Sequence, residues 1–334
     1  MQENLIKEYN QIKRTFAQNF KTTFLPIAQK YEKLRKILVC VAVLIDILSI
    51  GYWFYLAFFS KTGVISIDSD THIFLMLPVI VHGAITATIN LKIKKEIMPE
   101  VCKCIGNLTW SQGKYKNPEI LSQAKIISNN YNSIGIDDVV QGVYKDVTID
   151  IVEGHYYKGR KERNEKVEML GEEDIARNIV RRALGIKKRK CLFNGVFIVL
   201  NMNKNFKGHT IIRPDKLLKN SPSPELKLTT LEDVTFEKKY DVFTDDEIEA
   251  RYLITTSFMN RLNDLKVAFK AKKVSCAFYK GDLIIAFNEM KDLFTVFSLF
   301  KATDNSKQYA EMFEEFLSIV KIIDHFKLNE KIGL

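Results

Sequence analysis

The stretch "ILVCVAVLIDILSIGYWFYLAFF", residues 37–59, is apolar except for one acid, Asp46, near its middle. In a helix rising about 1.5 Å per residue, this stretch reaches about 34 Å, enough to cross the hydrocarbon core of a bilayer. The alternative is a buried helix of a soluble core. A secretory signal is disfavoured because a long polar segment precedes the stretch. We therefore predict a membrane span.

A second apolar run, residues 73–91, follows after a short polar link and reaches about 28 Å by the same arithmetic. The flanking charges are Lys33, Arg35 and Lys36 before the first run, Lys92, Lys94 and Lys95 after the second, and Lys61, Asp68 and Asp70 in the link. Lysine and arginine stay on the cytoplasmic side of a membrane. We predict a transmembrane helical hairpin over residues 37–91, with both chain termini cytoplasmic and about residues 60–72 outside.

Each run carries one titratable side chain at the same depth. Asp46 lies nine residues after Ile37, and His82 lies nine residues before Leu91. An antiparallel hairpin would place both about 13 Å from its cytoplasmic end. Because an isolated charge in hydrocarbon is costly, we predict that Asp46 and His82 share a hydrogen bond or an ion pair. The alternative is a neutral, protonated Asp46 at a contact between copies of this chain, which a homo-oligomer would provide.

Two helical patterns flank the hairpin. In residues 1–36, apolar side chains recur every three to four positions between basic ones, which predicts a cytoplasmic amphipathic helix ending near Pro26. That helix would pack on the rest of the protein or lie on the inner leaflet. An apolar stripe continues from Ile93 to Leu108 and predicts a helical stalk over residues 92–111, bent at Pro99.

In the remaining chain, residues 112–334, apolar and polar side chains partly alternate in a way typical of strands. The predicted strands lie in residues 138–159, 191–215, 231–243 and 272–289, and the predicted helices span residues 245–269 and 306–326. Turns are predicted at residues 203–208 and 280–282. Strands in series with few helices between them indicate an antiparallel sheet with flanking helices. The predicted class is α+β.

Composition narrows the function classes only slightly. The 334 residues are 46% hydrophobic and 27% charged, which excludes a disordered majority. A formal charge of +10 favours an anionic neighbour, such as phospholipid, nucleic acid or an acidic protein surface. Five cysteines form no disulfide framework in a chain of this length, which favours a reduced compartment.

The most concentrated positive patch of the cytoplasmic domain consists of Lys187, Lys188, Arg189 and Lys190. Nucleic-acid binding favours aromatic side chains between the charges, and this run contains none. We therefore predict anionic phospholipid as the ligand of this basic patch, and no nucleic acid. The alternative is the solvated end of an ordinary helix.

Two groups of acids have the chemistry of metal ligands or general bases. The first group is Asp241, Asp245, Asp246, Glu247 and Glu249, and the second is Asp137, Asp138 and Glu153 with His155. Thr244 followed by Glu247 fits a helix capping box, which favours a structural role for the first group. The second group is predicted on separate strand edges. The chain has no nucleophile elbow, phosphate loop or dinucleotide fingerprint, so we predict no metal and no cofactor.

Three segments resemble a bacterial membrane-anchored family catalogued as domain of unknown function 3137: "GIDDVVQGVYKDVTIDIVEG", "FNGVFIVLNMNKNFKGHTIIRPD" and "TFEKKYDVFTDDEIEARYLITTSFMNRL". The resemblance covers most of the chain and implies paired spans ahead of a cytoplasmic domain, in the inner membrane of a bacterium. It implies no substrate, cofactor or catalytic residue.

Two functions stay open. The first is a membrane-tethered, non-enzymatic binding or scaffold module that presents its cytoplasmic domain to a protein or an anionic lipid. The second is a membrane-bound hydrolase that uses the acidic residues of that domain.

Overall fold

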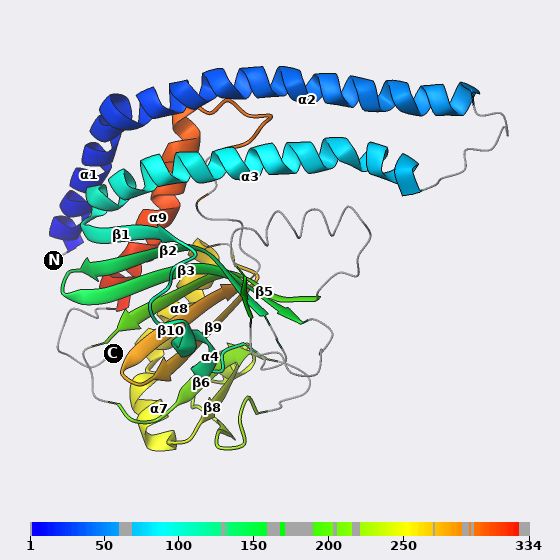
Figure 1. Ribbon diagram of the computed structural model, residues 1–334. Coiled ribbons are helices and arrows are strands. Elements are labelled where there is room, and N and C mark those ends of the chain that lie inside the picture. Colours follow the sequence, from blue (N-terminus) through cyan, green and yellow to red (C-terminus); the bar gives the residue numbers. More distant parts are fainter. Residues whose placement is uncertain are drawn as a thin grey trace. The chain divides into compact units, whose positions relative to one another are not determined.

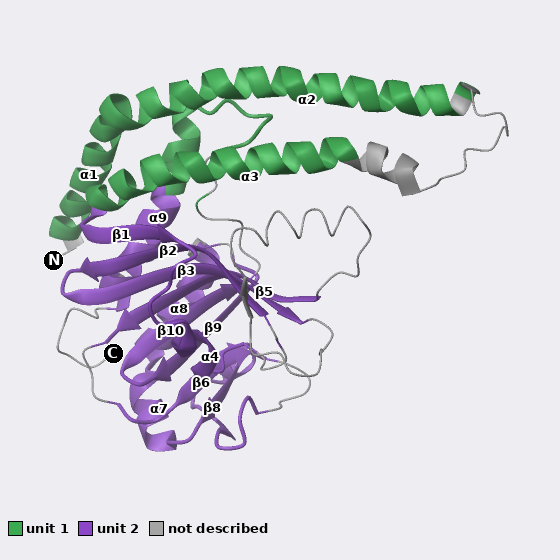
Figure 2. Ribbon diagram, in the orientation of Figure 1, with its two compact units in different colours: residues 1–104, 172–188, 294–312 green, residues 105–171, 189–293, 313–334 purple. Residues whose placement is uncertain are grey.

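The computed structural model describes residues 2–59, 69–127, 131, 133–158, 168–170, 190–202, 206–215, 221–269, 271–288, 294 and 297–326. The chain divides into two compact units (Figure 2). The helical unit comprises residues 1–104, 172–188 and 294–312, and the sheet unit comprises residues 105–171, 189–293 and 313–334.

The helical unit is built on long helices (Figure 1). They are α1 (Gln2–Asn19), a π-helical turn (Phe20–Phe24), α2 (Leu25–Phe59) and α3 (Ser69–Ile105). Helix α9 (Ser306–Phe326), predicted from its spacing, begins in this unit.

Two predicted helix boundaries are wrong. Pro26 does not end the N-terminal helix, because it is the second residue of α2, where its missing N–H is not needed. The π-helical turn just before it bonds the Leu25 N–H to the Phe20 carbonyl. At the other end α3 stops at Ile105, so Leu108 of the predicted stalk lies in a strand.

Within the described residues, one helix, Glu3–Leu56, is long and apolar enough for a membrane span or a signal segment. Only 11% of its most apolar window is buried inside the structure, whereas the core helix of a soluble protein is mostly buried. The described part of helix α3 does not meet the same criterion. The structure thus gives one clear candidate span, and the two-span hairpin is taken up below as a proposal.

The sheet unit confirms the α+β class. Its described residues form a ten-stranded sheet, nine of whose strands lie in the order β1-β2-β3-β5-β10-β9-β6-β8-β7. The strands are β1 (Asn107–Gln112), β2 (Ser133–Tyr144), β3 (Val147–Lys158), β4 (Glu168–Leu170), β5 (Lys190–Asn201), β6 (Thr210–Pro214), β7 (Lys227–Thr229), β8 (Tyr240–Thr244), β9 (Lys273–Tyr279) and β10 (Asp282–Asn288). Neighbours along this order are antiparallel, and β4 pairs with β2 in parallel.

Two tight turns join neighbouring strands, and the sequence predicted the second of them. Lys145 and Asp146 between β2 and β3 have φ of 49° and 63°, and Lys280 and Gly281 between β9 and β10 have φ of 51° and 83°. Left-handed conformations at both central positions match the twist of paired strands. The strands within residues 191–215, by contrast, are not neighbours, because β10 and β9 lie between β5 and β6.

The smaller helices differ from the predicted pattern. They are α4 (Pro118–Gln123), α6 (Val234–Glu237), α7 (Glu247–Leu253) and α8 (Thr256–Ala268). The strand predicted over residues 231–243 is mostly α6 and its flanks, with β8 at its end. The single helix predicted over residues 245–269 is α7 and α8, because Thr255 starts a new helix by accepting a hydrogen bond from the Phe258 N–H at 3.2 Å.

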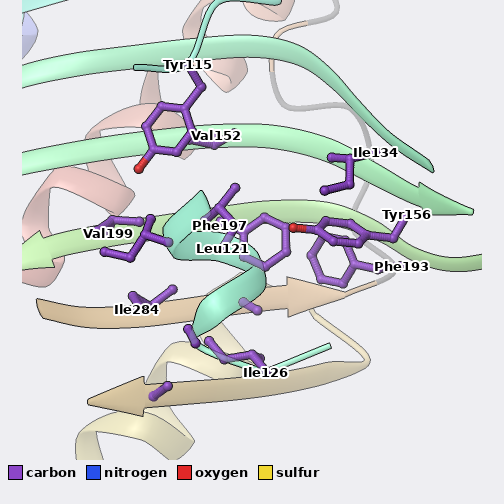
Figure 3. Close-up of a cluster of buried hydrophobic side chains, with 14 of the residues drawn as sticks. Tyr115, Leu121, Ile126, Ile134, Val152, Tyr156, Phe193, Phe197, Val199 and Ile284 are labelled. Carbon is purple, nitrogen blue, oxygen red and sulfur yellow. The ribbon is translucent and has the colours of Figure 1, made fainter. Parts of the chain in front are cut away.

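Apolar side chains cover both faces of the sheet. On one face Leu121 of α4 packs in a buried cluster with Phe197 of β5 and Tyr156 of β3 (Figure 3). On the other, the Phe258 ring of α8 lies 5.2 Å from the rings of both Phe278 in β9 and Phe326 in α9. Burial on both faces explains why central strands such as β5 read as nearly continuous apolar runs.

Candidate functional site

The structure brings the two titratable side chains of the apolar runs together. His82 Nε2 of α3 lies 3.3 Å from Asp46 Oδ1 of α2, and these side chains are 22% and 34% exposed. The two atoms do not meet hydrogen-bond geometry, so the contact is one of close opposite charges when the imidazole is protonated. What this polar pair does remains a prediction.

A second contact fixes the same antiparallel register between α2 and α3. The Tyr31 hydroxyl donates to Glu96 Oε1 at 2.6 Å, and Lys30 Nζ lies 3.2 Å from the same oxygen. The hydrogen bond from Tyr31 and the charge of Lys30 lower the pKa of the Glu96 carboxyl. Along the sequence, Asp46 follows Tyr31 by nearly as many residues as His82 precedes Glu96. In two antiparallel helices with this register, Asp46 lies opposite His82 and Tyr31 lies opposite Glu96.

Helix α2 carries its apolar side chains outward. Those exposed in the first apolar run are Ile37, Val41, Val43, Leu44, Ile47, Leu48, Ile50, Tyr52, Trp53, Phe54, Tyr55 and Phe58. On the side of Asp46, Ala42 and Ser49 are only 2% and 5% exposed. Soluble proteins rarely expose so large a contiguous apolar surface. A helix on the surface of a water-soluble protein has the opposite pattern, with its apolar side chains buried and its polar side chains exposed.

A charged clamp lies just before the first apolar run. Arg35 donates two hydrogen bonds to the Glu32 carboxylate, at 2.8 Å and 2.6 Å. Its Nη1 donates to the Leu299 carbonyl at 2.9 Å. Glu32 also accepts the Thr303 N–H at 2.8 Å. The guanidinium of Arg35 holds the pKa of Glu32 at about 2, despite the opposing effect of burial. The sequence does not predict these contacts, because Glu32 and Arg35 are far along the chain from Thr303 and Leu299.

The first acidic group caps a helix at a different residue from the one predicted. Asp246 is the N-cap of α7 and accepts the N–H groups of Ile248 and Glu249, both at 3.0 Å. Thr244 instead accepts the N–H of Asp246 itself at 3.1 Å. The predicted capping box of Thr244 and Glu247 is therefore wrong, although the structural role of this group is retained.

Two further acids of this group hold the loop before β6. Asp245 accepts the His209 N–H at 2.7 Å, and Glu249 accepts the N–H groups of Lys207 and Gly208 at 3.0 Å and 2.5 Å. A Cβ at Gly208 would lie 2.4 Å from the Glu249 carboxylate, so only glycine allows this approach without a shift. Backbone donors thus occupy both of these carboxylates.

The second acidic group lies on two paired strands, β2 and β3, at an irregularity in their pairing and not on separate strand edges. Asp137 and Asp138 occupy the register shift between Ile136 and Val139. Asp138 is buried and accepts the Trp110 indole N–H at 2.9 Å, while Asp137 contacts the His155 ring. In the part of the chain that the structure describes, no three His, Cys, Asp or Glu side chains are placed as metal ligands.

The basic patch falls largely outside the described residues. Lys187, Lys188 and Arg189 are not among them, and Lys190 is the exposed first residue of β5. Its lipid ligand therefore remains a prediction.

Fold and helices together define an α+β protein with a long apolar N-terminal helix. Residues 191–328 match the family described as "Protein of unknown function (DUF3137)". Two of the three segments behind the resemblance, residues 193–215 and 235–262, lie inside this match, and residues 135–154 lie outside it. The family description names no activity.

Among solved structures, one match is the "crystal structure of the mycobacterial trehalose monomycolate transport factor A, TtfA". It has a TM-score of 0.31 and 8% sequence identity, and covers 68% of this chain and 91% of that chain. A similarity of this size carries no argument about function. No curated protein matches the chain.

Proposed function

We propose that this protein is a membrane-tethered, non-enzymatic binding or scaffold module. Residues 37–91 form a two-span hairpin in the inner membrane of a bacterium, with both termini and the sheet unit in the cytoplasm. The sheet unit meets a protein or an anionic phospholipid there.

The observation that carries this proposal is the inverted pattern of α2. Apolar side chains such as Leu44 and Leu48 point away from the protein, while Ser49 and the polar pair lie on the side of α3. Hydrocarbon is the solvent that stabilises this arrangement, because it accepts exposed leucines and penalises an isolated charge. Basic residues at the opposite end from the link agree with the orientation.

The hydrogen bonds made by the first group of acidic side chains favour a binding function over a hydrolase. The carboxylates of Asp245 and Glu249 accept backbone N–H groups of the loop before β6, and that of Asp246 accepts those at the start of α7. A hydrolase would need at least one of these groups to face a substrate. Within the described residues, nothing specifically favours the hydrolase alternative.

The test exchanges two outward leucines for lysine. A full-length Leu44→Lys, Leu48→Lys variant is expressed in bacteria and its membranes are washed with alkaline carbonate. Each lysine near the middle of a span costs about 2.5 to 3.5 kcal/mol for insertion, so we expect the variant to leave the membrane fraction while the unchanged protein stays.

The matched control is Ile6→Lys, an equally exposed apolar residue of α1 outside the predicted span, which should stay in the membrane. Retention of the double variant, or carbonate release of the unchanged protein, would refute the proposal. Surface lysines on a soluble helix would have little effect.

A further inference from the structure

A turn from the C-terminal part of the chain lies against the long helices. Phe297 and Leu299 are buried, whereas Phe300 is 77% exposed. The Lys301 N–H donates to the Ser298 carbonyl at 3.3 Å, which closes the turn with Leu299 and Phe300 at its tip. Figure 1 shows this segment as the orange loop beside α2 and α3. The turn therefore presents one aromatic ring outward and one leucine inward.

Side chains of the helices satisfy the backbone of this turn. The Phe297 N–H donates to Asn90 Oδ1 at 3.2 Å, and the Leu299 carbonyl accepts from Arg35 at 2.9 Å. The Thr303 N–H donates to Glu32. Non-helical backbone is tolerated at membrane depth only where the protein satisfies its polar groups. The Phe297 and Thr303 N–H groups and the Leu299 carbonyl meet that condition.

The same contacts give the depth of the turn along the spans. Asn90, bonded to Phe297, is one residue from the cytoplasmic end of the second run, and Glu32, bonded to Thr303, precedes the first run. Phe300 lies between Phe297 and Thr303 along the turn, and its ring packs edge-on against the His82 ring, with 5.9 Å between the ring centroids. The segment thus starts and ends near the cytoplasmic boundary, and its tip lies beside the polar pair.

We propose that this turn is a third membrane-inserted element, with Phe300 among the acyl chains of the cytoplasmic leaflet. The inference rests on the proposed function, since it takes its depth from the two spans. Phe300 covers part of the His82 imidazole on the lipid side. Lys301 beside it has a long stem that brings its ammonium group to the headgroups, as lysines near membrane boundaries do.

The test places tryptophan at position 300 of the full-length protein in liposomes. Phe300→Trp is compared with the unchanged protein, whose own tryptophans give the background, in lipids with and without bromine on the acyl chains. Val43→Trp reports on the first span, and Val234→Trp reports on an exposed site of the sheet unit. All three replaced residues are exposed, so folding should tolerate the larger ring.

We expect brominated chains to quench the added emission of Phe300→Trp and Val43→Trp, and to leave that of Val234→Trp unchanged. Quenching at position 43 without quenching at position 300 would overturn the membrane-inserted turn and leave the spans in place. Loss of quenching at both positions would refute the spans and the turn together.

Discussion

In the proposed hairpin, an aspartate inside a span requires a polar partner at the same depth. Asp46 has one in His82, and the register set by Tyr31 and Glu96 holds the two level. The sequence predicted this juxtaposition because the ends of both apolar runs were marked by basic residues. It did not predict that Arg35 and Glu32 bind the backbone of Leu299 and Thr303, since nothing in a local pattern identifies a partner in a distant segment.

A double-mutant cycle tests the polar pair. If Asp46 and His82 interact, Asp46→Asn and His82→Gln together should destabilise the detergent-solubilised protein less than the sum of the single changes. We expect a coupling on the order of 1 kcal/mol, measured by unfolding with increasing sodium dodecyl sulfate. Ser49→Ala combined with His82→Gln is the control and should be additive. Strict additivity of the first pair would show that the two residues do not interact.

Acid should release the clamp of Glu32. Its pKa of about 2 lies below the ordinary value of 4.5, so the ionised carboxylate stabilises the folded state fully above about pH 4.5. This contribution falls as the pH drops towards 2. Protection of the Thr303 amide against hydrogen exchange should decrease over that window and should be low at all pH values in Glu32→Gln.

The control for this experiment is Glu96→Gln, which removes an acid that binds Tyr31 and Lys30 on the same pair of helices. It should leave the Thr303 amide protected. Equal loss in both variants would mean that general loosening, and not the clamp, governs this amide.

For helices and strands, the sequence predicted a hairpin that depends on a local turn, but it did not predict pairing between distant strands. The turn of Lys280 and Gly281 specified the β9–β10 hairpin, because adjacent strands joined by such a turn pair with each other. The pairing of β6 with β8 and β9 depends on contacts across the sheet, so the sequence did not exclude β5 as its neighbour. The break at Thr255 was missed because apolar spacing runs on across it.

The N-cap of α7 gives a prediction that separates the two capping schemes. Asp246→Ala removes the acceptor of two backbone N–H groups and should lower the free energy of unfolding by about 1 kcal/mol in urea. Glu247→Ala changes an exposed side chain and should be within about 0.5 kcal/mol of the unchanged protein. A larger loss from Glu247→Ala would restore the predicted capping box.

At the scale of the whole molecule, the basic patch should strengthen the attachment to anionic lipid. The full chain in neutral detergent is expected to retain phosphatidylglycerol, measured by native mass spectrometry, and added salt should weaken the retention. Changing Lys187, Lys188, Arg189 and Lys190 to glutamine should reduce it. The control neutralises four exposed lysines of the sheet unit, Lys227, Lys238, Lys239 and Lys273. Equal retention by both variants would identify the patch as an ordinary solvated surface.

The class of the sheet unit was predictable from strand spacing, whereas the partner of this unit was not. Exposed side chains such as Ile248 and Tyr252 of α7 follow no pattern tied to a ligand, so the sequence does not identify a partner. The proposed membrane hairpin depends on simpler chemistry, because hydrocarbon is a uniform solvent that requires one apolar composition over a fixed length.

Labelling of introduced cysteines tests that topology directly. Ser66→Cys and Ser306→Cys are made in the full-length protein and treated with a membrane-impermeant thiol reagent, with the outer membrane opened and the inner membrane intact. The unchanged protein gives the background of the native thiols. We expect Ser66→Cys to react before the inner membrane is broken and Ser306→Cys to react only afterwards. Reaction of Ser306→Cys alone in the intact state would reverse the orientation, and equal reaction of both would contradict a hairpin that spans the membrane.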